Sequence, residues 1–187
     1  MKRIAIFGSG GGSNARCILE YFTDNSDVEV ALIISNNASA GIFNHALEFD
    51  VPTLLLNRTE FYQTESLLDR LAEKQTDLIV LAGFLWLIPQ YLIRAYPEKI
   101  INIHPALLPK YGGKGMYGMN VHRAVKESGE SESGITIHMI DEVYDRGKIL
   151  YQESVNLDGS ETPEKIAAKV LKVEHANLAR VVADQLR

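Results

Sequence analysis

An asparagine and a histidine stand two residues apart at the end of an apolar run, in the stretch INIHPALLP that begins at Ile101. Side chains alternate across a strand, so Asn102 and His104 would share one face and the flanking isoleucines the other. A histidine can exchange a proton near neutral pH, and an asparagine amide can donate to a developing oxyanion. The pair is therefore a candidate catalytic site. Alternatively, Asn102 and His104 are a polar pair that only satisfies backbone groups at a strand end.

A carboxylate that could orient the histidine comes from the later loop DEVYDRG, which contains Asp141, Glu142 and Asp145. A carboxylate close to a histidine raises the histidine's pKa. Spacing alone does not separate the three acids, and a solvated surface loop is the competing interpretation. His138 precedes this loop in the apolar run GITIHMI, and we expect it to be structural rather than catalytic.

Another acid, Glu174, falls on the apolar stripe of the last helical segment, four residues from both Val170 and Leu178. A carboxylate that faces inward needs a partner or a ligand hydroxyl. Alternatively, it lies at the edge of the stripe and reaches water.

A glycine-rich turn, FGSGGGSN at residues 7–14, joins the first apolar run to the first helical pattern. Glycines allow close approach to a ligand, and a helix N-terminus is a natural phosphate site. The turn lacks both the third glycine of the dinucleotide fingerprint and the Gly-Lys-Ser/Thr of a P-loop. We therefore expect a small monophosphate on the amides of Gly12, Ser13 and Asn14. The alternative is a plain turn in which Ser13 caps the helix.

These residues need a scaffold, and the first half of the chain alternates short apolar runs with helical patterns. Strands are expected at residues 3–8, 28–35, 51–56, 77–83 and 99–104, with helices between them, one of which covers residues 59–75. This order predicts an α/β fold with a doubly wound, mostly parallel, Rossmann-like sheet. The second half predicts an antiparallel extension at residues 134–140 and 148–155, followed by a long helix capped by Thr162. Ligands of such sheets bind at the carboxyl ends of the strands, where Asn102 and His104 stand.

Composition excludes several classes of function. The 187 residues carry a formal charge of −5, which argues against a nucleic-acid or anionic-membrane partner. One cysteine permits no intrachain disulfide, and no apolar run is long enough to cross a bilayer. The N-terminus has too short an apolar run for a signal peptide, so we expect a cytoplasmic protein. The other histidines show no metal-ligand spacing, and we predict no metal site.

The whole pattern resembles the phosphoribosylglycinamide formyltransferases, the folate-dependent formyl transferases of purine biosynthesis. The resemblance covers nearly the whole chain and rests on the stretches GSGGGSN, LAGFLWLIP, NIHPALLPKY and GITIHMIDEVYDRGKIL and on the pair Glu174–His175. It implies one domain over residues 1–187, with a nucleotide- and phosphate-binding half at 1–104 and a folate-binding half at 105–187. The segment after LLPKY is longer than the family often has, and includes the glycine-rich loop 112–120.

The resemblance also implies roles for residues. Asn102, His104 and Asp145 match the catalytic trio, with a protonated His104 that Asp145 keeps charged. The phosphate would bind Gly12, Ser13 and Asn14, and the ribose hydroxyls would bind Glu174. The folate pocket would comprise Leu85, Trp86, Leu87, Ile88, Asp141, Glu142, Val143, Tyr144 and Asp145. The co-substrate would be 10-formyltetrahydrofolate and the acceptor glycinamide ribonucleotide, in a monomer or homodimer without nucleic-acid or membrane partners.

Other functions stay open at this point. One is a different 10-formyltetrahydrofolate-dependent transferase, and another is a formyltetrahydrofolate hydrolase with the same trio. A non-catalytic nucleotide-binding module explains the glycine turn but gives no task to Asn102, His104 and Asp145.

Overall fold

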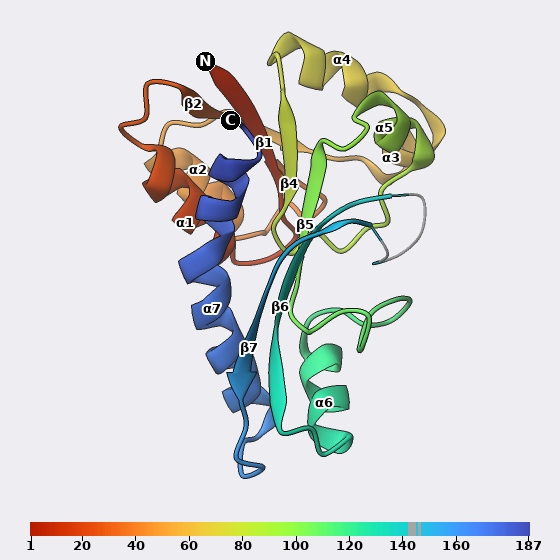
Figure 1. Ribbon diagram of the computed structural model, residues 1–187. Helices are drawn as coiled ribbons and strands as arrows, with labels where there is room; N and C mark the ends of the chain where they lie inside the picture. Colours follow the sequence, from red (N-terminus) through yellow and green to blue (C-terminus); the bar gives the residue numbers. More distant parts are fainter. Residues whose placement is uncertain (142–144, 146) are drawn as a thin grey trace. The chain divides into compact units, whose positions relative to one another are not determined.

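The computed structural model describes residues 1–141, 145 and 147–187, which form two compact units. Unit 1 contains residues 1–101 and 185–187, and unit 2 contains residues 102–184. The boundary runs through strand β5 (Ile100–His104), so the polar end of this strand belongs to unit 2. Figure 1 shows the course of the chain through both units.

Unit 1 is built on parallel strands. Their order is β3 (Thr53–Leu55), β2 (Val28–Ser35), β1 (Lys2–Phe7), β4 (Leu78–Leu81) and then the start of β5. All described pairings among the first four are parallel. Every residue of β4 is buried, as are the last four residues of β1 and of β2. Burial on both faces explains why these strands are continuous apolar runs rather than alternating ones.

The helices of unit 1 are α1 (Ser13–Phe22), α2 (Ile42–Glu48), α3 (Arg58–Gln63), α4 (Ser66–Glu73) and α5 (Gln90–Ala95). Helices α1 and α2 pack against each other and against β2, while α3 to α5 lie on the other side of the strands (Figure 1). The predicted doubly wound, mostly parallel arrangement is therefore confirmed.

One predicted element was wrong. The single helix expected over residues 59–75 is two helices, α3 and α4, because the chain is extended at Thr64. Asn57 caps α3 by accepting from two backbone amides, and the Thr64 hydroxyl hydrogen bonds to Ser66 at the start of α4. Only Thr64 lies at the break, where its side chain offers the backbone an alternative to a continuous helix.

Unit 2 contains the antiparallel extension that the sequence predicts. Its strand order is the end of β5, then β6 (Glu132–Met139), then β7 (Ile149–Asn156), and β6 pairs with β7 antiparallel. Helices α6 (Met119–Glu127) and α7 (Pro163–Asp184) pack against each other, and α7 runs along β6 and β7 (Figure 1). The predicted cap of α7 is confirmed, since the Thr162 hydroxyl accepts from the Lys165 amide at 3.4 Å.

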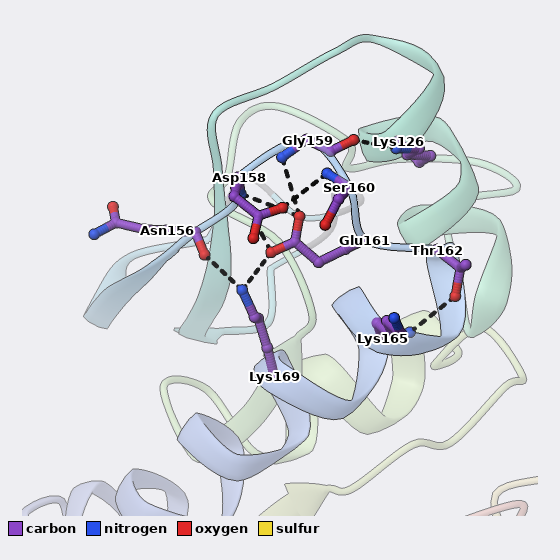
Figure 2. Close-up of polar contacts among 9 residues, drawn as sticks. All are labelled: Lys126, Asn156, Asp158, Gly159, Ser160, Glu161, Thr162, Lys165 and Lys169. Atoms are coloured by element: carbon purple, nitrogen blue, oxygen red, sulfur yellow. Dashed lines mark hydrogen bonds and ion pairs between the residues drawn. The ribbon is translucent and has the colours of Figure 1, made fainter.

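The turn between β7 and α7 is built around a buried carboxylate, that of Glu161 (Figure 2). It accepts from the amides of Asp158 and Gly159 at 3.1 Å and forms an ion pair with Lys169 of α7. Lys126 of α6 donates to the Gly159 carbonyl at 2.7 Å, so the same turn connects both helices of unit 2.

Within the residues that the structure describes, no helix has the length and apolarity needed to cross a membrane.

Candidate active site

The centre of the candidate site is a contact between Asn102 and His138 in unit 2. The Asn102 Nδ2 lies 3.1 Å from His138 Nε2, and His138 Nδ1 lies 3.0 Å from the Met139 carbonyl. A carbonyl only accepts, so Nδ1 carries the proton and Nε2 accepts from the Asn102 amide. Asn102 therefore keeps its second N–H and its carbonyl oxygen for another partner. His138 was expected from the sequence to be structural, and its contact with the predicted catalytic residue Asn102 was not predicted.

Asp145 joins the same cluster. Its Oδ1 lies 3.6 Å from His138 Nε2, and its Oδ2 accepts from the Gly113 amide at 2.7 Å. Its backbone has φ 52°, in the left-handed region. Nearby, Gly147 cannot be replaced without a shift, because a Cβ there would lie 1.8 Å from the Met139 carbonyl oxygen. The Asp145 carboxylate thus lies beside the His138 ring, and Gly147 lies close to the end of β6.

His104 is buried beside this cluster in unit 2 and contacts a backbone group. Its Nε2 lies 2.7 Å from the Tyr111 carbonyl, which again can only accept. In the neutral ring, Nε2 therefore carries the proton and Nδ1 is left as a proton acceptor.

The loop that follows β5 is held by side chains of the two neighbouring strands. The Thr136 hydroxyl donates to the Ala106 carbonyl at 2.7 Å and accepts from the Leu108 amide at 2.9 Å. Gln152 donates to both the Leu108 carbonyl and the Thr136 hydroxyl. The buried backbone groups of Ala106 and Leu108 are thus satisfied by Thr136 and Gln152 and do not require Asn102 or His104.

Three histidines of unit 2, His104, His122 and His138, are buried, and we call them the buried histidines. Burial lowers the pKa of each below its usual value. For His104, the charge of Asp145 and the hydrogen bond to Tyr111 oppose this shift in pKa only in part. The protonated His104 stays a prediction; in the unliganded site desolvation outweighs the nearby carboxylate and lowers the pKa of the ring.

The predicted phosphate-binding residues lie in unit 1, at the start of α1. The helix begins at Ser13, and its N-cap is Gly12, with φ 78° and no side-chain hydrogen bond. A Cβ on Gly12 would lie 2.7 Å from the Ile42 Cα, so glycine is required there. Ser13 is not the cap that the plain-turn interpretation needs. The first amides of a helix have no acceptor within the helix itself, which is the general basis of anion binding at this position.

The predicted folate-binding stretch in unit 1, residues 85–88, leaves β4 without regular structure. Leu85 and Leu87 are about half exposed, whereas Ile88 is buried in the core. The Leu85 amide already donates to the Ser9 hydroxyl at 2.9 Å. Trp86 packs in an aromatic cluster with Phe61, Tyr62 and Phe84, and Arg58 lies over its ring.

The remaining predicted site residues lie in unit 2 or outside the residues that the structure describes. Glu174 is buried on α7, as the apolar stripe predicts, and does not reach water from its edge. Asp141 is exposed. The folate-binding predictions for Glu142, Val143 and Tyr144 fall on residues that the structure does not describe. Among the described residues, no group of three or more histidine, cysteine or acidic side chains could hold a metal ion.

Comparison with known proteins gives consistent matches. The model of the family described as formyl transferase matches residues 2–182. Phosphoribosylglycinamide formyltransferase of Bacillus subtilis is 35% identical, over 94% of this chain and 90% of its own. The chloroplastic phosphoribosylglycinamide formyltransferase of Arabidopsis thaliana is 43% identical over 97% of this chain. The chain spans only 64% of that plant protein's length and 60% of the Vigna unguiculata protein of the same name.

Solved structures agree with these matches. Glycinamide ribonucleotide transformylase 1 from Geobacillus kaustophilus superimposes with a TM-score of 0.90, with 32% identity and full coverage of both chains. Phosphoribosylglycinamide formyltransferase from Anaplasma phagocytophilum gives a TM-score of 0.89 at 31% identity, over 97% of this chain and 84% of its own.

Proposed function

Because the chain belongs to the formyl transferase family, we propose that it transfers the formyl group of 10-formyltetrahydrofolate to the amine of glycinamide ribonucleotide, a reaction of purine biosynthesis. The observation that carries the proposal is the cluster of Asn102, His138 and Asp145 beside the buried His104. The names of the Bacillus and plant relatives support the choice of acceptor.

In this proposal the amine attacks the formyl carbon directly, so a new C–N bond forms and the carbonyl oxygen becomes an oxyanion. The second N–H of the Asn102 amide donates to this oxyanion, while the first holds His138 Nε2. One preorganised donor of this kind contributes about 3–4 kcal/mol to transition-state stabilisation.

His104 moves the proton. After attack the amine nitrogen is positively charged and must lose a proton, and the neutral Nδ1 of His104 accepts it. The carboxylate of Asp145 and the Tyr111 carbonyl stabilise the resulting imidazolium, since both raise the pKa of His104. The proton then passes to N10 of the folate as the C–N10 bond breaks, which yields tetrahydrofolate and the formylated amide. No covalent enzyme intermediate is required.

Binding residues complete the proposal. The amides of Gly12, Ser13 and Asn14 would hold the substrate phosphate at the start of α1, and Glu174 would accept from the ribose hydroxyls. The stretch 85–88 and the loop 141–145 would hold the pterin. The half-exposed Leu85 and Leu87 suit an apolar contact with its ring.

The test is an assay with the formyl donor, with and without glycinamide ribonucleotide. We expect formylated product only when the acceptor is present, and loss of about 10²–10⁴-fold in kcat when His104 is replaced by alanine. Release of formate without acceptor would identify a formyltetrahydrofolate hydrolase instead. Binding of a ribose monophosphate without any turnover would identify a nucleotide-binding module.

A further inference from the structure

We propose that Tyr111 is a positioning residue for His104, and that its side-chain contact with Glu130 holds the Tyr111 carbonyl against the histidine ring. The contact thereby determines which ring nitrogen of His104 carries the proton. The inference rests on the proposed function, in which His104 accepts a proton through Nδ1.

The ring of His104 contacts the Tyr111 carbonyl. The 2.7 Å separation from Nε2 is a good hydrogen bond, and the carbonyl can only accept. A neutral imidazole has one N–H and one lone pair, so this carbonyl selects the tautomer with the proton on Nε2. Without it, the two tautomers would be free to exchange.

The backbone around Tyr111 does not by itself fix the direction of its carbonyl. Tyr111 has φ 56°, in the left-handed region that a residue with a Cβ rarely adopts. Two glycines follow, and Gly113 has φ 90°. Glycine adds conformational freedom to this part of the chain. The direction of the carbonyl therefore depends on a contact elsewhere in Tyr111.

The side chain of Tyr111 provides a contact that can fix the direction of its carbonyl. Its hydroxyl donates to Glu130 Oε1 at 3.0 Å, and Lys110 Nζ lies 3.0 Å from the same oxygen. Both hydrogen bonds lower the pKa of Glu130, so the carboxylate remains an ionised acceptor. Glu130 lies between α6 and β6, and is therefore attached to two regular elements. The hydroxyl of Tyr111 thus fixes a strained backbone whose carbonyl faces the proposed base.

The experiment uses two variants that remove the contact from opposite sides, Tyr111→Phe and Glu130→Ala. The matched controls are Tyr117→Phe, which removes a hydroxyl from an exposed tyrosine of the same segment, and Glu130→Gln, which keeps an acceptor oxygen. Nitrogen-15 NMR of the histidine rings reports the tautomer of His104 directly, without substrate. A His104→Ala spectrum assigns its signals.

In the parent protein we expect the proton of neutral His104 on Nε2. In both Tyr111→Phe and Glu130→Ala the tautomer with the proton on Nδ1 should become populated, and kcat should fall roughly three- to tenfold with little change in KM, as for the loss of one hydrogen bond. The double variant should be no worse than either single variant, because both remove the same contact. Glu130→Gln and Tyr117→Phe should match the parent protein.

An unchanged tautomer in either Tyr111→Phe or Glu130→Ala would overturn the inference, as would a Glu130→Gln variant that behaves like Glu130→Ala. This result is separate from the proposed function. A parent protein that fails to formylate glycinamide ribonucleotide contradicts the proposed reaction, whereas the NMR measurement needs no substrate and still decides whether Tyr111 positions His104.

Discussion

Truncation of Asn102 to alanine should damage catalysis and stability by separate and measurable amounts. The Asn102 amide donates to His138 Nε2 at 3.1 Å, and His138 is fully buried. The truncation leaves that ring nitrogen without its donor, which costs about 1–3 kcal/mol of unfolding free energy. For a chain of this size, that lowers the melting temperature by roughly 2–12 °C.

The catalytic effect has a different origin. The second N–H of the same amide is the proposed donor to the oxyanion, and the loss of one such donor reduces kcat by about 10²–10³-fold. The KM values for the folate and for the ribonucleotide should change little, because the contact between the Asn102 amide and the oxyanion is strongest in the transition state. Urea unfolding measures the first effect, and steady-state assays below the unfolding transition measure the second. Asn44→Ala, at an exposed position of α2, is the matched control and should change neither.

A variant that loses stability as expected but keeps kcat within about threefold of the parent would refute the reasoning. Asn102 would then serve only as the partner of His138, and the oxyanion would need another donor.

Three further predictions concern stability. Gly12→Ala should destabilise the protein by at least about 1–2 kcal/mol in urea unfolding, since the residue has φ 78° and its new Cβ would contact the backbone of α2, whereas Gly11→Ala, with open space around it, should cost far less. The pKa of each of the buried histidines is lowered, so below about pH 6.5 the unfolded chain binds more protons than the folded one. The unfolding free energy should therefore fall as pH drops from 7.5 to 5.5, and less steeply in His122→Gln; a slope that His122→Gln leaves unchanged would contradict this assignment. Glu161→Gln should lower the melting temperature because it removes the ion pair that holds the turn before α7, while the exposed Glu127→Gln should not, and equal melting temperatures would show that the buried carboxylate contributes nothing.

The sequence predicted the scaffold well because hydrophobic patterns decide it. Continuous apolar runs identified the parallel strands of unit 1, and the run that ends at His104 was assigned to the correct element. The helix expected over residues 59–75 failed because a single residue, Thr64, interrupts it with a local side-chain hydrogen bond. Periodicity does not detect such a competition between side chain and backbone.

The site was less accessible to sequence reasoning. The spacing of Asn102 and His104 suggested a reactive pair, but their partners depend on contacts between distant parts of the chain. The contact between Asn102 and His138 joins residues 36 positions apart, and spacing could not predict it. Alternation along residues 134–140 placed Thr136 and His138 on one face of the strand. This was the available signal that His138 and Thr136 point the same way. The pKa direction of His104 could not be predicted either, because it depends on how completely the ring is buried.

The central claim is tested most directly by following the formyl carbon. Donor labelled in the formyl group is incubated with the protein and glycinamide ribonucleotide, and the label is located by mass spectrometry. We predict that the label appears in the amide of the ribonucleotide, and that its transfer is lost when His104 is replaced by alanine. Label found in free formate, or left on the folate in the presence of acceptor, would contradict the proposed reaction.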